Sequence, residues 1–313
     1  MSSKVDPAYF KTYHGGCHCG AFKFAIRIPE LKAIMACNCS ICIKNGILGN
    51  IWFLDEGPQE FIVEKGDIDA LKEYSFEPRH LTYRFCGVCG TNVFVKELGE
   101  IGINARALGD IDVEALPKKY HDGWKKGKPY AAEFGEQVEW KQPEGKTEEK
   151  TEDGLVTYYG NCHCGKIRYA LRSKSLDDLE VMQCNCSMCG KNSHRHIYPT
   201  RTALQVHDPE RVGSKYNVLS KDAAQTFCGF CGTFVFVDID DESVDLRPLN
   251  VRTIDDIDIY KLKYIICLIP WLKVRRIIRS ANLLYNVHEQ GYWLMSLHSA
   301  PVVMRNDAPT TSK

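Results

Sequence analysis

The sequence predicts a mostly β protein built from two tandem copies of one domain. Three observations support this: seven cysteines occur twice in the same order, each copy contains strand-like apolar segments, and a polar segment separates the copies. We expect the first domain at residues 13–140, a linker at 141–153, the second domain at 154–263, and an atypical C-terminal tail at 264–313.

Composition limits the classes of function. The 313 residues are 44% apolar, which is enough for two cores, and 40 Lys and Arg balance 40 Asp and Glu. A chain without net charge has no overall field to recruit nucleic acid or an anionic membrane. No apolar stretch reaches the roughly 18–20 residues of a membrane span. We therefore expect neither a nucleic-acid partner nor a transmembrane segment, and composition leaves the oligomeric state open.

The fifteen cysteines are unusually many. The first residues, "MSSKVDPAYFKTYHGG", contain no apolar segment of a secretory signal, which predicts a cytoplasmic, reducing environment. In that environment cysteines serve metal binding or catalysis more often than disulfides.

The repeat is read most easily from three cysteine motifs. The first copy has "GGCHCG", "CNCSIC" and "FCGVCGT", and the second has "GNCHCG", "CNCSMC" and "FCGFCGT", at offsets of 145, 147 and 142 residues. The match continues in "INARALGDID" and "LNVRTIDDID", 146 residues apart. A period of this length indicates a duplicated domain, because solenoid repeats run about 20–50 residues.

Strand signals dominate both copies. In the first, residues 21–28, 50–54, 81–85 and 91–98 alternate or run apolar, and in the second residues 166–172 and 234–239 do so. Between 15 and 115 no long amphipathic helix is expected. The linker, "KQPEGKTEEKTED", is polar and has no apolar period, which is typical of a flexible connection.

The two outer motifs of each copy predict a four-cysteine metal site. Side chains two residues apart on extended backbone share a face, and the glycines of C-G-x-C-G permit a tight turn that aims both sulfurs at one point. Four thiolates suit a closed structural zinc site, with iron–sulfur ligation by the same thiols as an alternative. The central residues His18 and His163 should point away from the metal. The expected ligands are Cys17, Cys19, Cys86 and Cys89, and Cys162, Cys164, Cys228 and Cys231.

The inner motif leaves three cysteines in each copy, namely Cys37, Cys39 and Cys42, and Cys184, Cys186 and Cys189. Three protein ligands with a vacant fourth position are the pattern of a catalytic zinc. Such a centre prefers a further sulfur ligand and would hold a bound thiol as thiolate. The alternative is that His80, His194 or His196 supplies a fourth ligand and closes a second structural site. Near-identical triplets should not need different fourth ligands, which favours the open site.

The motif order, completed by N-x-R-x-[LI]-x-D, resembles the glutathione-dependent formaldehyde-activating enzymes, which are grouped with centromere protein V. The resemblance covers about 15–130 and 158–262. It implies an Mss-four-like zinc-binding β fold, a structural zinc in each four-cysteine site, and a second zinc at each triplet, up to four ions per chain. The implied reaction joins glutathione, as co-substrate, to formaldehyde or a similar small aldehyde, which is carbon–sulfur lyase chemistry in reverse.

The second copy departs from the family pattern. The first copy keeps Lys44 and Gly46 after its triplet, whereas the second has Ser193 at the glycine position, which puts a shared glutathione pocket there in doubt. Lys44, Arg106 and Arg252 could bind an anionic peptide, but solvated surface charge is the preferred interpretation. The competing function is a zinc-stabilised interaction module without catalysis.

The tail has two interpretations. "WLKVRRIIRSANLLYNV" could form a basic amphipathic helix, whereas "YIICLIPWL" is short and contains Pro270. Alternatively the tail replaces the natural terminus through an error in the gene model, which an intact-mass measurement of the natural protein would reveal. Cys267 belongs to neither set of seven and receives no role.

Overall fold

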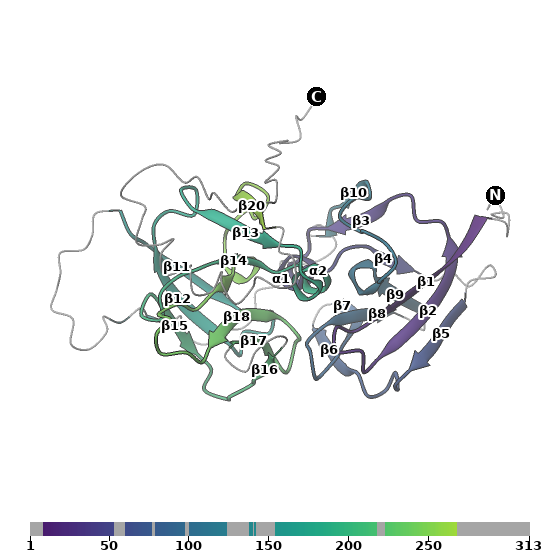
Figure 1. Cartoon of the computed structure of the whole chain (residues 1–313), viewed down its shortest axis with the longest axis horizontal. Helices are drawn as coiled ribbons and strands as arrows, with labels where there is room; N and C mark the ends of the chain where they lie inside the picture. Colours follow the sequence, from purple (N-terminus) through teal and green to yellow (C-terminus); the bar gives the residue numbers. More distant parts are fainter. Residues whose placement is uncertain are drawn as a thin grey trace, which may run out of the picture.

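The computed structural model describes residues 9–52, 60–76, 79–97, 100–123, 138–139, 141, 154–217 and 223–267. Over these residues the chain forms two lobes of β-sheet, one from each copy (Figure 1). The predicted mostly β class and tandem arrangement are thereby confirmed. The predicted linker beyond residue 141, and the tail beyond residue 267, lie outside the described residues. In the described part we find no helix with the length and apolar character needed to cross a bilayer.

The first domain pairs its described strands in three sheets. One has the order β1-β2-β5, from β1 (Phe10–Gly16), β2 (Lys23–Pro29) and β5 (Glu60–Lys65). Another has the order β4-β9-β8-β7-β6, from β4 (Asn50–Trp52), β9 (Glu100–Asn104), β8 (Asn92–Glu97), β7 (Arg79–Phe85) and β6 (Lys72–Phe76). A short parallel pair joins β3 (Ile34–Cys37) to β10 (Lys118–His121).

The second domain repeats this arrangement. Its three-stranded sheet is β11 (Val156–Asn161), β12 (Arg168–Ser173) and β15 (Leu204–His207). A longer sheet runs β16 (Gly213–Asn217), β17 (Ala223–Cys228), β18 (Phe234–Ile239), β19 (Leu249–Asn250), β14 (Arg195–Ile197), β13 (Glu180–Cys184) and β20 (Lys263–Cys267). β20 pairs with β13 in parallel, as β10 does with β3, so the sheet continues into the first residues of the predicted tail.

The strands form where the apolar pattern predicts them. Along β2, Phe24, Ile26 and Ile28 are buried on one face, which is the alternation of a half-buried strand. The run Val93, Phe94 and Val95 in β8 is buried throughout, because this strand lies in the middle of its sheet. Each predicted strand segment overlaps one of the observed strands.

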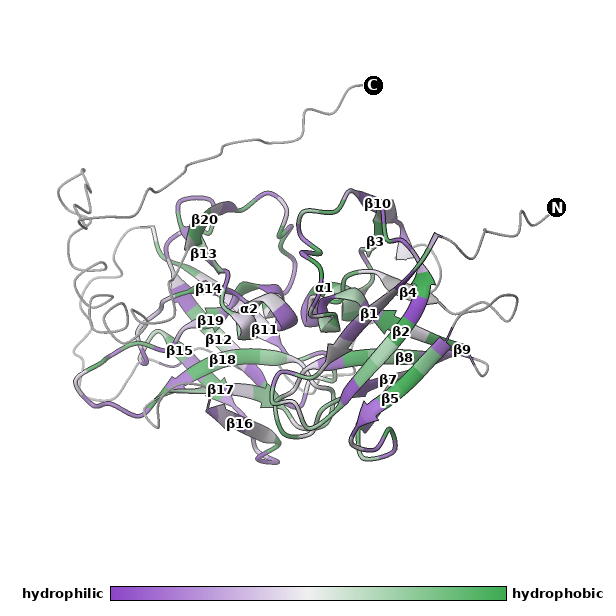
Figure 2. Ribbon diagram, turned by 45° about the vertical axis from the view of Figure 1, so that its right-hand side comes forward, coloured by the Kyte–Doolittle hydropathy of each residue, from purple (hydrophilic) through white to green (hydrophobic). Residues whose placement is uncertain are grey.

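Two short helices lie between the lobes, and each begins immediately after the second cysteine of a triplet. They are α1 (Ser40–Asn45) and α2 (Ser187–Asn192). Both views of the chain place them side by side at the centre (Figures 1 and 2). Each ends at a residue with left-handed backbone, Gly46 with φ 62° and Ser193 with φ 53°.

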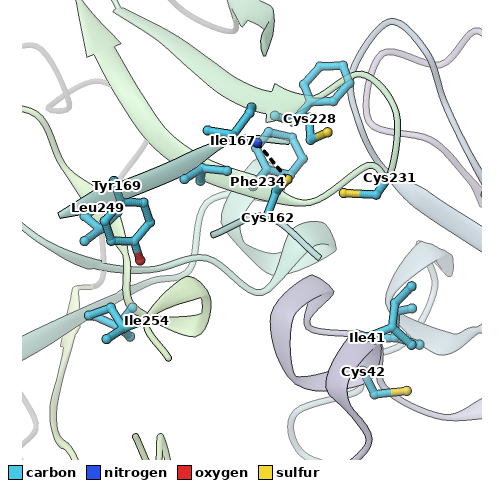
Figure 3. Close-up of a cluster of buried hydrophobic side chains, with 14 of the residues drawn as sticks. Ile41, Cys42, Cys162, Ile167, Tyr169, Cys228, Cys231, Phe234, Leu249 and Ile254 are labelled. Carbon is cyan, nitrogen blue, oxygen red and sulfur yellow. Dashed lines mark hydrogen bonds between the residues drawn. The ribbon is translucent and has the colours of Figure 1, made fainter. Parts of the chain in front are cut away.

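One hydrophobic cluster spans both domains, and a second cluster of buried residues lies within the first domain. The cluster that spans both domains includes Cys39, Ile41 and Phe85 from the first domain together with Phe227 and Phe234 from the second. Figure 3 shows Ile41 and Cys42 of α1 beside the cysteines of the second domain. Because this cluster crosses the boundary between the copies, the domains form one packed unit.

The C-G-x-C-G turns of the four-cysteine motifs lie where the two domains meet. Gly90 has φ +69°, and a Cβ on it would lie 2.7 Å from Phe234 and 2.8 Å from Phe227 of the other domain. The second copy shows the same packing with the roles exchanged, because a Cβ on Gly232 would lie 2.8 Å from Phe85. These glycines are required both by the backbone conformation and by the close approach of the domains.

We expect Gly90→Ala to destabilise the chain more than Gly20→Ala. Both positions have positive φ, which costs an alanine about 1–2 kcal/mol, but the nearest atom to a Cβ on Gly20 is 3.7 Å away. Overpacking against the phenylalanines should add about 1–3 kcal/mol at Gly90. Urea denaturation of the full chain measures both values. Equal losses would show that domain packing at Gly90 contributes nothing.

Candidate metal centres

Four groups of cysteine sulfurs could hold a metal ion such as zinc. In each group every Sγ lies within 4.8 Å of the others. Two groups have four members, which we call the quartets, and two have three members, which we call the trios. The quartets are Cys17, Cys19, Cys86 and Cys89, and Cys162, Cys164, Cys228 and Cys231; the trios are Cys37, Cys39 and Cys42, and Cys184, Cys186 and Cys189.

The quartets have the spacing of a tetrahedral zinc site. Sulfurs bound at about 2.3 Å to one tetrahedral ion lie about 3.8 Å apart. Cys19 Sγ lies 3.5 Å from Cys17 Sγ and 3.7 Å from Cys86 Sγ. In the second quartet the corresponding distances from Cys164 Sγ are 3.5 and 3.6 Å. The donor set and its geometry therefore fit a closed zinc site.

Backbone turns hold the quartet sulfurs in place. The N–H of Gly90 donates to Cys86 O at 2.8 Å, which closes the turn between β7 and β8. The N–H of Phe22 donates to Cys17 Sγ at 3.3 Å, and the N–H of Ile167 donates to Cys162 Sγ at the same distance. These N–H···S bonds fix the positions of the two sulfurs on the turns that carry them.

Each trio gathers at the start of a short helix. Cys37 ends β3, Cys39 is the N-cap of α1, and Cys42 lies in its first turn. Cys39 and Cys42 are buried, whereas Cys37 is half-buried. Among the residues that the structure describes, no other His, Cys, Asp or Glu has a ligand atom within 4.8 Å of all three sulfurs.

The trio thiols share one readily formed negative charge. Hydrogen bonds from Cys39 and then Cys42 lower the pKa of Cys37 to about 2. In the second trio, hydrogen bonds from Cys184 and then Cys189 lower the pKa of Cys186 to about 2. Without an ion, two thiols donate to one thiolate, and a bound cation would replace the two remaining protons.

A segment that the sequence analysis missed lies beside the first trio. β10 places His121 opposite Cys37, and Asn38 Nδ2 donates to Asp122 Oδ1 at 3.0 Å. A Cβ on Gly123 would lie 2.4 Å from Cys37 Sγ, so only glycine fits at this sulfur. The signal in the sequence is "HDG" at the end of a strand, with His121 as the last strand residue. In the second domain, Cys267 occupies the position opposite Cys184.

A histidine distinguishes the second trio. His194 Nδ1 lies 4.0 Å from Cys189 Sγ, and its ring is 1% exposed, with Nε2 lacking a hydrogen-bond partner. The first domain has buried Ile47 at this position. Burial lowers the pKa of His194 well below its usual value, and that of His196 to about 4, so both rings are neutral at pH 7. The side chain of His80 lies outside the described part.

We expect His194→Ile to leave the zinc content of the chain unchanged. The ring approaches one sulfur of the trio and does not lie within 4.8 Å of all three. Stability should stay equal or rise, because a buried polar atom without a partner costs about 1–3 kcal/mol. Elemental analysis and thermal unfolding measure both quantities. Loss of one zinc per chain would identify His194 as the fourth ligand.

The sequence suggested that Lys44, Arg106 and Arg252 are solvated or bind an anionic ligand, but the structure places all three at the domain interface. Lys44 Nζ donates to Asp255 Oδ1 at 2.8 Å and to Asn161 O at 3.0 Å, both in the other domain. Arg106 and Arg252 are 5% and 6% exposed. The solvated-charge interpretation is wrong for all three, and their bonds also argue against an anionic peptide.

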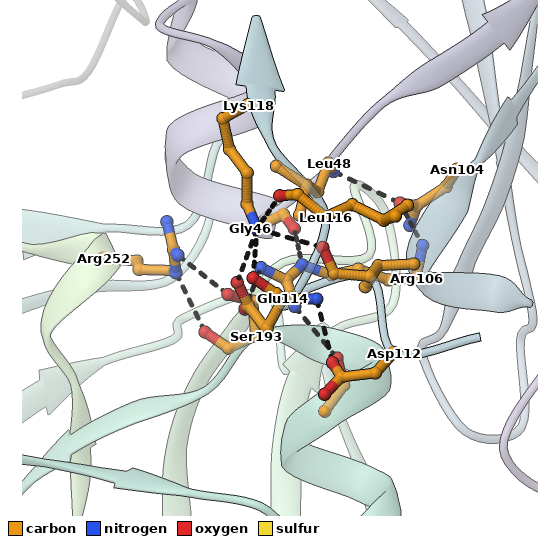
Figure 4. Close-up of polar contacts among 12 residues, drawn as sticks. Gly46, Leu48, Asn104, Arg106, Asp112, Glu114, Leu116, Lys118, Ser193 and Arg252 are labelled. Atoms are coloured by element: carbon orange, nitrogen blue, oxygen red, sulfur yellow. Dashed lines mark hydrogen bonds and ion pairs between the residues drawn. The ribbon is translucent and has the colours of Figure 1, made fainter. Parts of the chain in front are cut away.

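The two arginines join the helices from opposite sides. Arg106 Nη1 donates to Gly190 O at 3.2 Å, and Arg252 Nη1 donates to Ile43 O at 3.1 Å, in each case in the other domain's helix. Figure 4 shows both arginines with Gly46 and Ser193, the residues that follow the two helices. A cation at these carbonyls is favourable because the helix dipole places partial negative charge near a helix C-terminus. Arg106 also pairs with Glu114 at 2.6 Å.

The glycine that follows the first triplet has a structural reason. A Cβ on Gly46 would lie 2.3 Å from the Cβ of Ser193, so the ends of α1 and α2 meet there. Ser193 Oγ accepts a hydrogen bond of 2.7 Å from Arg252 Nη2. The difference between glycine and serine at this position therefore belongs to the domain interface, and says little about a glutathione pocket.

Comparison with known proteins places the chain in a family. The model of the family described as glutathione-dependent formaldehyde-activating enzyme matches residues 12–125 and again residues 157–266. The chain belongs to this family. Both matches include one quartet and one trio. The formaldehyde-activating enzyme family is thus represented here by two tandem domains in one chain.

A solved crystal structure is similar to part of this chain. It is a Rhodobacter sphaeroides protein with 20% sequence identity, and the match covers 34% of this chain and 98% of that one. Its TM-score of 0.29 is too low to support an argument about the fold.

Proposed function

We propose that this member of the formaldehyde-activating enzyme family is a zinc-dependent carbon–sulfur lyase. It would catalyse the reversible addition of a thiol such as glutathione to formaldehyde or another small carbonyl, as an S-(hydroxymethyl)glutathione synthase does. The observation that carries the proposal is the trio, which assembles three thiols where the quartet of the same domain assembles four. Three donors leave a tetrahedral ion one position for a ligand from outside.

The donor chemistry fits two kinds of zinc site. The quartets would hold structural zinc, and the trios would hold the second pair of ions, up to four per chain. A zinc ion on three thiolates supplies Lewis acidity that keeps a bound thiol in its nucleophilic thiolate form.

The reaction balances without an oxidant or a reductant. The thiolate sulfur forms a bond to the carbonyl carbon, the carbon–oxygen π bond breaks, and the oxygen takes one proton to give a hydroxymethyl thioether. The proton released by the incoming thiol equals the proton taken up by the product. Cys37 is the half-buried member of the first trio, so a ligand from outside would approach the ion from the side of this sulfur.

The first trio is the better candidate for catalysis. It faces His121, Asp122 and Gly123 in the described part of the chain, whereas the second trio has the buried ring of His194 against Cys189. This asymmetry supports turnover in the first domain, with glutathione or a similar thiol and a small aldehyde as substrates.

The alternative is a non-catalytic, zinc-stabilised interaction module. It is favoured by the use of α1 and α2 in domain packing, since the same residues that follow the trios hold the lobes together. Under this alternative the trios would bind metal but would leave the rate of thiol addition unchanged.

Exchange spectroscopy distinguishes the two functions. Thiols add to formaldehyde spontaneously, so the measurement must be the rate of exchange between ¹³C-formaldehyde and its glutathione adduct, and not the yield. The enzyme should raise this rate at catalytic concentration without moving the equilibrium. If the zinc-loaded chain accelerates exchange for none of a panel of thiols, including glutathione and cysteine, the module interpretation stands.

A further inference from the structure

The trio helix of each domain is held by a histidine of the other domain. His163 of the second domain is fully buried and contacts two hydroxyl groups of the first. Its Nε2 lies 3.0 Å from Ser40 Oγ, and its Nδ1 lies 2.7 Å from Tyr74 OH. Ser40 lies between Cys39 and Cys42, so the imidazole contacts the trio motif itself.

The same contacts occur with the domains exchanged. His18 Nε2 lies 2.9 Å from Ser187 Oγ, and His18 Nδ1 lies 3.0 Å from Tyr216 OH. Ser187 is the first residue of α2 and follows Cys186. These residues are related to His163, Ser40 and Tyr74 by the offsets of the duplicated motifs, so the interface has approximate twofold symmetry.

A lysine near the end of each trio helix also bonds to the other domain. Lys191 Nζ, in α2, donates to Ala107 O at 2.9 Å and to Gly16 O at 3.2 Å in the first domain. Lys44, in α1, is bound in the same way to Thr253 O and Asn161 O of the second domain. Each trio helix is therefore fixed at its start by a histidine and near its end by a lysine, both in contacts across the interface.

The histidines also connect the two kinds of metal site. His163 lies between the quartet cysteines Cys162 and Cys164, and its N–H donates to Thr233 Oγ at 3.2 Å. Asn45 at the end of α1 reaches the same quartet, because its Nδ2 donates to Cys231 O at 3.4 Å. The trio of the first domain is thus built on the quartet of the second.

We propose that each trio is positioned by the quartet of the opposite domain, with His163 and His18 as the positioning residues. The inference rests on the trios binding a metal, as proposed above, but not on the reaction. It makes the tandem chain a single functional unit in which the second copy completes the site of the first. Removing one hydrogen bond of this kind should weaken metal binding about three- to tenfold, because a net hydrogen bond contributes about 1 kcal/mol.

The proposal can be tested in the full chain with two parent variants, each of which has one trio disabled. Cys186→Ser leaves the first trio as the intact one, and Cys39→Ser leaves the second. With the quartets loaded with zinc, cobalt is titrated into the remaining trio and followed by its visible and sulfur-to-metal bands. In the Cys186→Ser background, His163→Ala should weaken cobalt binding and shift the bands, whereas His18→Ala should change neither.

The effects should exchange in the Cys39→Ser background, where His18→Ala weakens binding and His163→Ala does not. His163→Gln, whose amide can still meet the hydroxyl of Ser40, should recover part of the affinity. If His163→Ala does not fold, Ser40→Ala removes the same bond from a half-buried position.

Three results would overturn the inference. The first is that each histidine affects the trio of its own domain, and the second is that both histidines affect both trios equally. The third is that neither affects any trio, provided that quartet zinc is retained. A parent background in which the trio takes up no cobalt would instead remove the proposed metal site, and the inference with it.

Discussion

Cys39→Ala is expected to reduce the catalysed exchange between formaldehyde and its thiol adduct by about a hundredfold or more, while both domains stay folded. Removing even an outer partner of a metal ligand typically costs 10–100-fold, and this change removes a ligand. The fold should survive because α1 is held independently of that sulfur, through Lys44 and Asn45. Exchange spectroscopy measures the rate, and near-ultraviolet circular dichroism reports the fold.

Cys186→Ala in the second trio is the matched control. It removes the equivalent sulfur from the site that carries His194, so its effect on exchange should be smaller than that of Cys39→Ala. Each variant should lose one zinc per chain. Full activity of Cys39→Ala with three zinc ions bound would place the chemistry outside the first trio.

Cys231→Ser should have the largest effect on stability. Zinc contributes about 10–16 kcal/mol of apparent binding free energy to small structural sites, which is comparable to the whole stability of a domain, about 5–15 kcal/mol. Cys231 is 1% exposed and belongs to the core that both domains share. Its loss should therefore destabilise both domains together, as seen in a single thermal transition at a lower temperature.

Cys39→Ala provides the comparison, because it removes a sulfur of similar burial from a trio of the same core. A strong chelator should reproduce the effect of Cys231→Ser on the parent chain. If Cys231→Ser lost one zinc and kept the parent melting temperature, the quartet would not be structural.

The fold class and the cysteine groups could be predicted because their signals are local. A strand shows its alternation within a few residues, as Phe24, Ile26 and Ile28 do. The spacing within the C-x-C and C-G-x-C-G motifs determines how their sulfurs are placed. The duplication showed which motifs belong to the same domain. Only four sulfurs from two such turns had to meet, and they do so within each domain.

The domain interface could not be predicted because its contacts join residues far apart in the sequence. Lys44 and Asp255 are 211 residues apart, and no residue near Lys44 in the sequence indicates that Asp255 is its partner. The sequence around a lysine has the same local pattern whether the side chain is solvated or buried. The available signal was that His18, Lys44 and Arg106 recur in the second copy as His163, Lys191 and Arg252. Residues kept in both copies but not needed as ligands are candidates for contacts between the copies.

The site beside Cys37 was missed for a different reason. "HDG" is short and polar, and it lies at the end of β10, a strand whose parallel pairing with β3 is non-local. Only that pairing places His121, Asp122 and Gly123 at the trio. The counterpart in the second domain begins at Cys267, and the residues after it lie outside the described part.

Metal content and thiol response of the cobalt-substituted chain together form one decisive measurement. Four ions per chain should bind, two at quartets and two at trios, and added glutathione should shift the bands of trio cobalt while those of the quartets stay fixed. Two ions per chain, or four whose spectrum is indifferent to thiol, would contradict an open three-cysteine centre in this protein.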